Sequence, residues 1–231
     1  MKATVLLDPA RLDRPDTDVR REPFPLLIAH GQLPEDARNE LDRDFPRYSS
    51  AGFFPYDPVD CGPSINALVT DLTAPAFASA IGQRLGIPNL AEYPTLVTLC
   101  RYLNKRHGTI HTDSKSKVAT ALLYLNRQWT DTSNGCLRFL HRIDDIDDMV
   151  APELTPLYGE FAVFKRCENS FHGHLPFEGE RRVIQVAWLT SEEEKLRKTR
   201  RGKFSRAFKK LIGALDRRFG ARRDRNAAHW D

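Results

Sequence analysis

The spacing of apolar residues changes character about 93 residues into the chain. Before that point, apolar positions recur at intervals of three and four, which predicts helices over Ser64–Leu72 and Pro75–Leu85. A short strand is expected at Phe24–Ala29. A further helix opens at Leu33–Ala37, where proline and acidic residues suit a helix start, and it ends near Phe45-Pro46. The first part of the chain is therefore predicted to be largely helical.

From Tyr93 onward the chain consists of short strand-like runs, separated by turn-forming residues and with no helices between them. The runs are Thr95–Leu103, Val118–Leu125, Cys136–Leu140, Gly159–Phe164 and Arg182–Leu189. This pattern favours an antiparallel jelly roll over a parallel sheet with crossover helices. We predict a mainly β fold with a double-stranded β-helix (jelly-roll) core and N-terminal helices packed on one sheet. One domain would span residues 1–190, helical to about 92 and with its β core over 93–190.

Residues 191–231 are predicted to form a basic, amphipathic helical tail. Of the 35 lysines and arginines, 14 follow Glu194, against 3 of the 31 acidic residues. Apolar residues recur there at spacings of three and four, at Phe204, Phe208, Leu211, Leu215 and Phe219. The 200–220 helix could contact an anionic membrane surface, or its apolar stripe could pack on the jelly roll or on a second subunit. The second interpretation is favoured, because apolar stripes usually bury against protein. The tail has no base-reading motif, so no specific nucleic-acid partner is expected.

Composition indicates an ordinary globular protein, at 41% hydrophobic and 10% aromatic residues. The four cysteines are widely spread and form no C-x-x-C pair, which favours free thiols in a reducing compartment. The N-terminus lacks the features of a signal peptide, and no apolar stretch approaches the roughly 20 residues that span a bilayer. We therefore expect a cytoplasmic protein, either free or peripheral to the inner face of a membrane.

Two histidine motifs carry the candidate chemistry. They are His111-Thr112-Asp113 and, about sixty residues later, His172. Two imidazoles and one carboxylate on one face of a metal form the triad of non-haem Fe(II) oxygenases. A lone H-x-D arises easily by chance in a chain with 7 histidines. Here both motifs lie near strand ends, where side chains can converge on a cavity. The alternative is that each histidine merely satisfies a local hydrogen bond.

Five motifs around these histidines occur in a familiar order between about Thr95 and Thr190. They are Arg101-Tyr102-Leu103 ahead of His111, Leu123–Asn126, Asn134–Phe139, Glu160–Phe164 ahead of Ser170-Phe171-His172, and Gly179–Arg182 ahead of Trp188. Together they resemble the prolyl-hydroxylase-like Fe(II)/2-oxoglutarate-dependent dioxygenases.

The resemblance implies that His111, Asp113 and His172 bind Fe(II). It further implies that a cation late in the motif series grips the distal carboxylate of 2-oxoglutarate, with tyrosine hydroxyls beside it. The corresponding residues here are Arg182 for the cation and Tyr124 and Tyr102 for the hydroxyls.

Departures from the family pattern limit these assignments. Arg181 is a rival anchor, since strand alternation sends neighbouring side chains to opposite faces. The six-residue spacing to Trp188 favours Arg182. His174 could contact the substrate or serve as an alternative metal ligand. Val186 stands where related enzymes often have a hydroxyl residue, and Cys136 replaces a glycine.

The activity that the resemblance implies is hydroxylation of an unactivated C–H bond by dioxygen, coupled to decarboxylation of 2-oxoglutarate to succinate. The substrate would be a peptidyl or free amino acid, or a small or lipid-linked saccharide. Lys115 and Lys117 near the pocket mouth could recognise an anionic substrate or form a solvated turn. One alternative is a cupin-type metalloenzyme that does not use 2-oxoglutarate, with His174 also on the metal. Another is a non-catalytic jelly-roll binding module.

Overall fold

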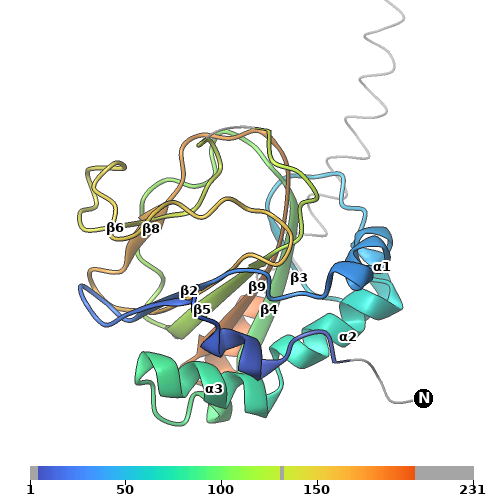
Figure 1. Cartoon of the computed structure of the whole chain (residues 1–231), viewed down its shortest axis with the longest axis horizontal. Coiled ribbons are helices and arrows are strands. Elements are labelled where there is room, and N and C mark those ends of the chain that lie inside the picture. Colours follow the sequence, from blue (N-terminus) through green and yellow to red (C-terminus); the bar gives the residue numbers. More distant parts are fainter. Residues whose placement is uncertain (1–4, 131–132, 201–231) are drawn as a thin grey trace, which may run out of the picture.

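Two antiparallel sheets face each other in the computed structural model, which describes residues 5–130 and 133–200. The large sheet has seven strands, in the order β1 (Asp18–Arg20), β2 (Leu26–Ala29), β7 (Phe161–Lys165), β5 (Lys117–Tyr124), β9 (Gly179–Leu189), β4 (Thr95–Leu103) and β3 (Phe53–Pro55). The small sheet pairs β6 (Arg138–Leu140) with β8 (Phe171–Gly173). Figure 1 shows the small sheet on one side of the large sheet and the helices on the other.

Three α-helices precede the long strands: α1 (Arg38–Asp44), α2 (Pro63–Leu72) and α3 (Pro75–Leu85). Figure 1 shows α2 and α3 beneath the large sheet and α1 at its side, next to α2. A 3₁₀ turn at Glu35–Ala37 leads into α1. Proline stands in the first turn of α2 and α3, where its missing N–H costs no hydrogen bond. Helix α3 ends at Gly86, whose φ of 63° gives the left-handed C-cap that glycine adopts without strain.

Strand alternation divides the apolar residues between two cores. On β9, the side chains of Ile184, Val186 and Trp188 lie in the core between the large sheet and the helices. The alternate residue Val183 lies in a second core between the two sheets. A one-residue change of register would exchange these sets, because successive side chains of a strand point to opposite faces.

A β-bulge breaks this alternation on β4. The register between β4 and β9 shifts between Cys100 and Tyr102. Cys100 and Leu103 both lie in the core between the sheets, although they are three positions apart and regular alternation would send them to opposite faces. The extra residue of a bulge lets the strand change which face its side chains serve. Tyr102 is thereby turned away from the inter-sheet side.

The predicted fold class is confirmed, and each strand and helix predicted ahead of residue 190 occurs within a few residues of its expected ends. Strands β1, β3 and β8 were not predicted, since three residues are too few to display a period of two. The division into a domain over 1–190 and a tail stays a prediction. Residues 192–200 are helical, whereas the predicted apolar stripe of the tail lies outside the described residues. Within residues 5–130 and 133–200, no helix is long and apolar enough to cross a bilayer.

The helix-covered core should carry much of the stability. Replacing Ile184, which is fully buried, with alanine should lower the free energy of unfolding by about 2–5 kcal/mol, because the lost methyl groups leave a cavity. The same substitution at Ile143, which is 56% exposed, should stay within about 0.5 kcal/mol. Urea unfolding of both variants measures the difference. Equal losses would contradict this assignment of the core.

Candidate active site

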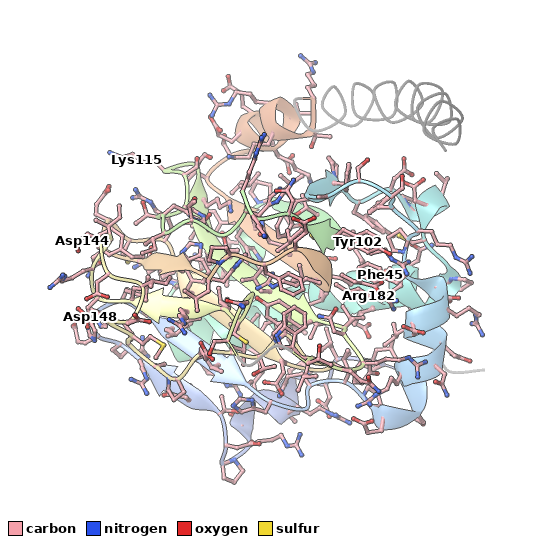
Figure 2. The ribbon with its side chains drawn as sticks, turned by 90° about the horizontal axis from the view of Figure 1, so that it is seen from above. Phe45, Tyr102, Lys115, Asp144, Asp148 and Arg182 are labelled. Carbon is pink, nitrogen blue, oxygen red and sulfur yellow. The ribbon has the colours of Figure 1, made fainter. Side chains whose placement is uncertain are left out.

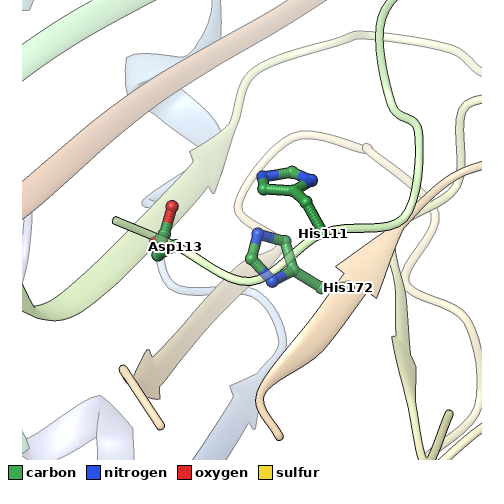
Figure 3. Close-up of side chains that lie close together, drawn as sticks. All are labelled: His111, Asp113 and His172. Carbon is green, nitrogen blue, oxygen red and sulfur yellow. The ribbon is translucent and has the colours of Figure 1, made fainter. Parts of the chain in front are cut away.

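A reciprocal pair of backbone hydrogen bonds joins His111 to His172. The amide of His111 donates to the carbonyl of His172 at 3.1 Å, and the amide of His172 donates to the carbonyl of His111 at 3.0 Å. Residues paired in this way on antiparallel segments place their side chains on the same face. The two imidazole rings accordingly lie 4.4 Å apart between centroids (Figure 3).

Each histidine is oriented by a second contact. The Nδ1 atom of His111 lies 2.8 Å from the carbonyl oxygen of Thr109, and that of His172 lies 3.0 Å from the carbonyl oxygen of Ser170. An Nδ1–H that donates to a carbonyl fixes the tautomer in which Nε2 has a free lone pair. The two Nε2 atoms are therefore available to a metal ion.

Asp113 completes a cluster with the two histidines. Among the described residues, these three form the one group of potential metal ligands whose donor atoms lie within 4.8 Å of one another (Figure 3). The carboxylate accepts hydrogen bonds from Lys117 Nζ at 2.7 Å and Thr120 Oγ1 at 2.5 Å. Each carboxylate oxygen has two lone pairs, so both bonds leave room for a metal.

Electrostatics keep this cluster in the protonation state that a metal needs. Burial opposes the charge of Asp113, but the positive charge of Lys117, the neighbouring His172 and the hydrogen bonds from Lys117 and Thr120 lower its pKa to about 2. Burial lowers the pKa of His172 to about 4, against the attraction of Asp113. Near neutral pH the site therefore offers a carboxylate and a neutral imidazole, the forms that bind metals.

The cluster lines one end of a cavity of about 360 Å³ between the two sheets. The guanidinium of Arg181 lines the same cavity and is 3% exposed. It donates hydrogen bonds to the carbonyl of Gly135 at 2.7 Å and to the hydroxyl of Tyr124 at 2.9 Å. Within the described part of the chain, Arg181 has no carboxylate partner. A buried cation without a counterion is costly, so the cavity is suited to an anionic ligand.

The sequence around the cavity is similar to that of a known superfamily. Residues 97–190 match the model of the 2OG-Fe(II) oxygenase superfamily, where 2OG is 2-oxoglutarate. This segment belongs to that superfamily. It contains both histidine motifs and Arg181. The oxygenase family implies Fe(II) as the metal and 2-oxoglutarate as the co-substrate. No curated protein sequence matches the chain.

Two solved structures share the fold. A prolyl-4-hydroxylase from Pseudomonas putida is 18% identical with a TM-score of 0.56, and the match covers 82% of this chain and 97% of that one. A prolyl hydroxylase from Trichoplax adhaerens, solved in complex with a peptide fragment of the hypoxia-inducible factor, is 15% identical with a TM-score of 0.50. That match covers 74% of this chain and 86% of the relative. At these identities the likeness establishes the jelly-roll fold alone.

The residues of the oxygenase fit both groups that the family implies. Two oriented imidazoles and a carboxylate are the donor set that non-haem Fe(II) takes from proteins. The buried guanidinium of Arg181 suits a ligand with a second, remote carboxylate. Burial raises the pKa of Tyr124 against the opposing charge of Arg181, so its hydroxyl stays protonated. The Tyr124 oxygen accepts from Arg181, and its O–H remains able to donate to a carboxylate.

The expected position of Arg182 is wrong. Its side chain lies outside the oxygenase cavity, bonded to Asp42 and, at 2.7 Å, to Glu180. Figure 2 shows it beside Phe45 and the N-terminal helix α1. Arg182 is two residues before Ile184 on β9, so both side chains lie on the helix-covered face, whereas Arg181 points into the cavity.

The expected position of Tyr102 is also wrong, again because its side chain points to the other face of the sheet. It lies with Arg182 in a separate cleft next to α1 (Figure 2), and Leu103 lines the oxygenase cavity in its place. The β-bulge after Cys100 produces this exchange, and nothing in the sequence marks its position. Tyr124, by contrast, does line the cavity as expected.

His174 lies in the cavity but outside the cluster of metal ligands. Its Nδ1 atom is 2.7 Å from the carbonyl oxygen of Leu175. Burial and the charge of Arg181 lower its pKa to about 4, which keeps the ring neutral. Gln185, which no sequence motif marks, also lines the cavity, whereas its neighbour Val186 packs in the helix-covered core. The sequence does indicate this orientation of β9, because the apolar residues Ile184, Val186 and Trp188 alternate with the residues that face the cavity.

Gly108 shapes the cavity wall that holds His174. Its φ is 84°, and a Cβ atom built there would overlap the His174 ring. Replacing Gly108 with alanine should cost about 1–2 kcal/mol from the left-handed backbone and more from displacement of the ring. In a His174→Ala background only the backbone cost should remain. Urea unfolding of the four proteins in this double-mutant cycle measures the coupling, and a penalty equal in both backgrounds would contradict the packing described.

Proposed function

We propose that this oxygenase hydroxylates an unactivated C–H bond of an amino acid, either free or within a peptide. His111, Asp113 and His172 hold Fe(II), and Arg181, in place of Arg182, binds the distal carboxylate of 2-oxoglutarate. The observation that carries the proposal is the buried guanidinium of Arg181, without a carboxylate partner among the described residues, in the cavity that contains the three ligands.

When bound, Fe(II) and 2-oxoglutarate supply the oxidising chemistry, with dioxygen as oxidant and succinate and carbon dioxide as products. The protein's own residues orient and shield the reactants. The carbonyls of Thr109 and Ser170 hold both imidazole rings in place through Nδ1. Arg181 and the O–H of Tyr124 bind the far end of the co-substrate, which positions its reactive end at the metal. Leu122 and Leu137 line the cavity and help to exclude water.

A peptide or amino-acid substrate is supported by the shared fold and by the Trichoplax relative, which was solved with a peptide fragment. Fold alone does not determine substrate, so a small or lipid-linked saccharide stays the alternative class. Succinate release in the presence of amino acids, peptides and saccharides distinguishes the two classes.

Iron binding should depend on His172 and not on His174. His172→Ala should weaken Fe(II) binding by more than about a hundredfold, beyond the effect typical of a residue that only supports a ligand. His174→Ala should leave Fe(II) affinity nearly unchanged, because its ring lies outside the ligand cluster. Anaerobic Fe(II) titration of the full chain measures both. Equal losses in the two variants would favour the cupin-type site with His174 on the metal.

Co-substrate binding should depend on Arg181 and not on Arg182. Arg181→Met should raise the Kd of 2-oxoglutarate by about ten- to a hundredfold, the effect of losing hydrogen bonds to a charged group. Arg182→Met is the matched control, since it removes the neighbouring guanidinium on the opposite face of β9. The visible band of the anaerobic Fe(II)–2-oxoglutarate complex reports the affinity. Loss of binding in Arg182→Met alone would overturn the assignment, and absence of any band in the unaltered protein would overturn the proposed function.

A further inference from the structure

The metal end of the cavity carries more positive charge than its neighbours can balance. Lys117 lines the cavity with a side chain that is 13% exposed, and its ammonium lies 2.7 Å from Asp113. Lys198, in the helical segment 192–200, lies 3.4 Å from the hydroxyl of Ser114, the residue after Asp113. Lys117 and Lys198 thus contact the neighbouring residues Asp113 and Ser114, which brings both ammonium groups to the same end of the cavity. Burial and the positive charge of Lys117 lower the pKa of Lys198, against the attraction of Glu194 and Asp113.

The other carboxylates near this end have cations of their own. Glu168 pairs with Arg166 at 2.9 Å and with Lys115 at 3.6 Å. Glu194 pairs with Arg197 at 2.6 Å. Asp113 is thus the carboxylate left to Lys117, and it is also a member of the metal-ligand cluster.

Binding of Fe(II) and 2-oxoglutarate would take the negative charge of Asp113 away from Lys117. The two positive charges of Fe(II) would be offset by Asp113 and by one carboxylate of 2-oxoglutarate, and the other carboxylate would neutralise Arg181. The ammonium of Lys117 would then be buried with no counter-charge of its own, and Lys198 would repel it further. An uncompensated buried charge is strongly unfavourable, and a bound anion would remove the cost.

We propose that Lys117 and Lys198 form a subsite for an anionic group of the substrate, such as a carboxylate or a phosphate, beside the metal and at the opposite end of the cavity from Arg181. This inference rests on the proposed function, which places Fe(II) on Asp113. It gives the substrate a negative charge near the carbon that is oxidised, so that neutral analogues would bind less well.

Separate replacements of Lys117, Lys198 and Lys115 by methionine test the inference, and Lys115→Met is the matched control. Lys115 lies in the loop that leads into β5, two residues before Lys117, but its side chain is 83% exposed and contacts Glu168. Figure 2 shows Lys115 at the edge of the molecule. Calorimetric titration of sodium sulfate at constant ionic strength would be run on the full chain, without additions and with anaerobic Fe(II) plus saturating 2-oxoglutarate. A parallel titration with sodium acetate separates a carboxylate subsite from a phosphate-like one.

We expect one anion per chain, bound at least tenfold more tightly by the loaded protein than by the metal-free protein. Lys117→Met should abolish this binding and Lys198→Met should weaken it about tenfold, whereas Lys115→Met should not change it. Lys198 bonds to Ser114 and not to the carboxylate of Asp113. Its variant should therefore keep normal Fe(II) affinity and separate anion binding from support of the ligand.

Anion binding that survives Lys117→Met, or none in any state, would overturn the inference even if the Fe(II)–2-oxoglutarate band forms normally. Loss of Fe(II) affinity in Lys117→Met with unchanged anion binding would assign Lys117 a purely positioning role. Lys117-dependent anion binding without the visible band would instead overturn the proposed function and leave the anion subsite standing.

Discussion

The backbone pairing of His111 with His172 is the interaction on which the site depends. The two residues are far apart in sequence, and they meet because β8 and the segment before Asp113 run antiparallel at the edge of the small sheet. Their reciprocal hydrogen bonds set the separation and the common direction of both imidazoles before any metal binds. Asp113 follows two residues after His111 and is held by Lys117 and Thr120 of β5, which belongs to the large sheet. The ligand cluster is therefore built across the space between the sheets.

The large sheet separates two environments with different tasks. Its helix-covered face is filled with apolar side chains and is sealed on the outside by α2 and α3. Its other face supplies Thr120, Tyr124, Arg181 and Gln185 to the cavity. The polar side chains on that face contact one another or line the cavity, so they do not interrupt the apolar packing against the helices. This division lets one strand, β9, contribute both a rigid core and a charged ligand contact.

Local sequence patterns predicted the N-terminal helices and the longer strands, because each has a clear spacing, and the resemblance to a known family predicted the ligand cluster. They did not predict which of Arg181 and Arg182 enters the cavity. That choice depends on the phase of β9, and the apolar alternation of Ile184, Val186 and Trp188 carried this information more directly than the distance to Trp188. Tyr102 could not have been placed from the sequence, since a single bulged residue after Cys100 exchanges the faces to which the last side chains of β4 point. The pairing of β8 with β6 was equally hidden, because three-residue strands arise from tertiary contacts and not from local propensity.

The pairing of β2 with β7 bears on what counts as a unit of this protein. The segment 97–190 that matches the family model contains every proposed ligand, but β2, α2 and α3 lie before it. Cut at those limits, the segment would lose the partner of one edge of β7 and the helices that cover Ile184, Val186 and Trp188. An unpaired strand edge beside a bare apolar face is prone to self-association. The folding unit is thus larger than the segment 97–190, and the helices ahead of that segment are part of the scaffold that any transplantation of this site would have to bring along.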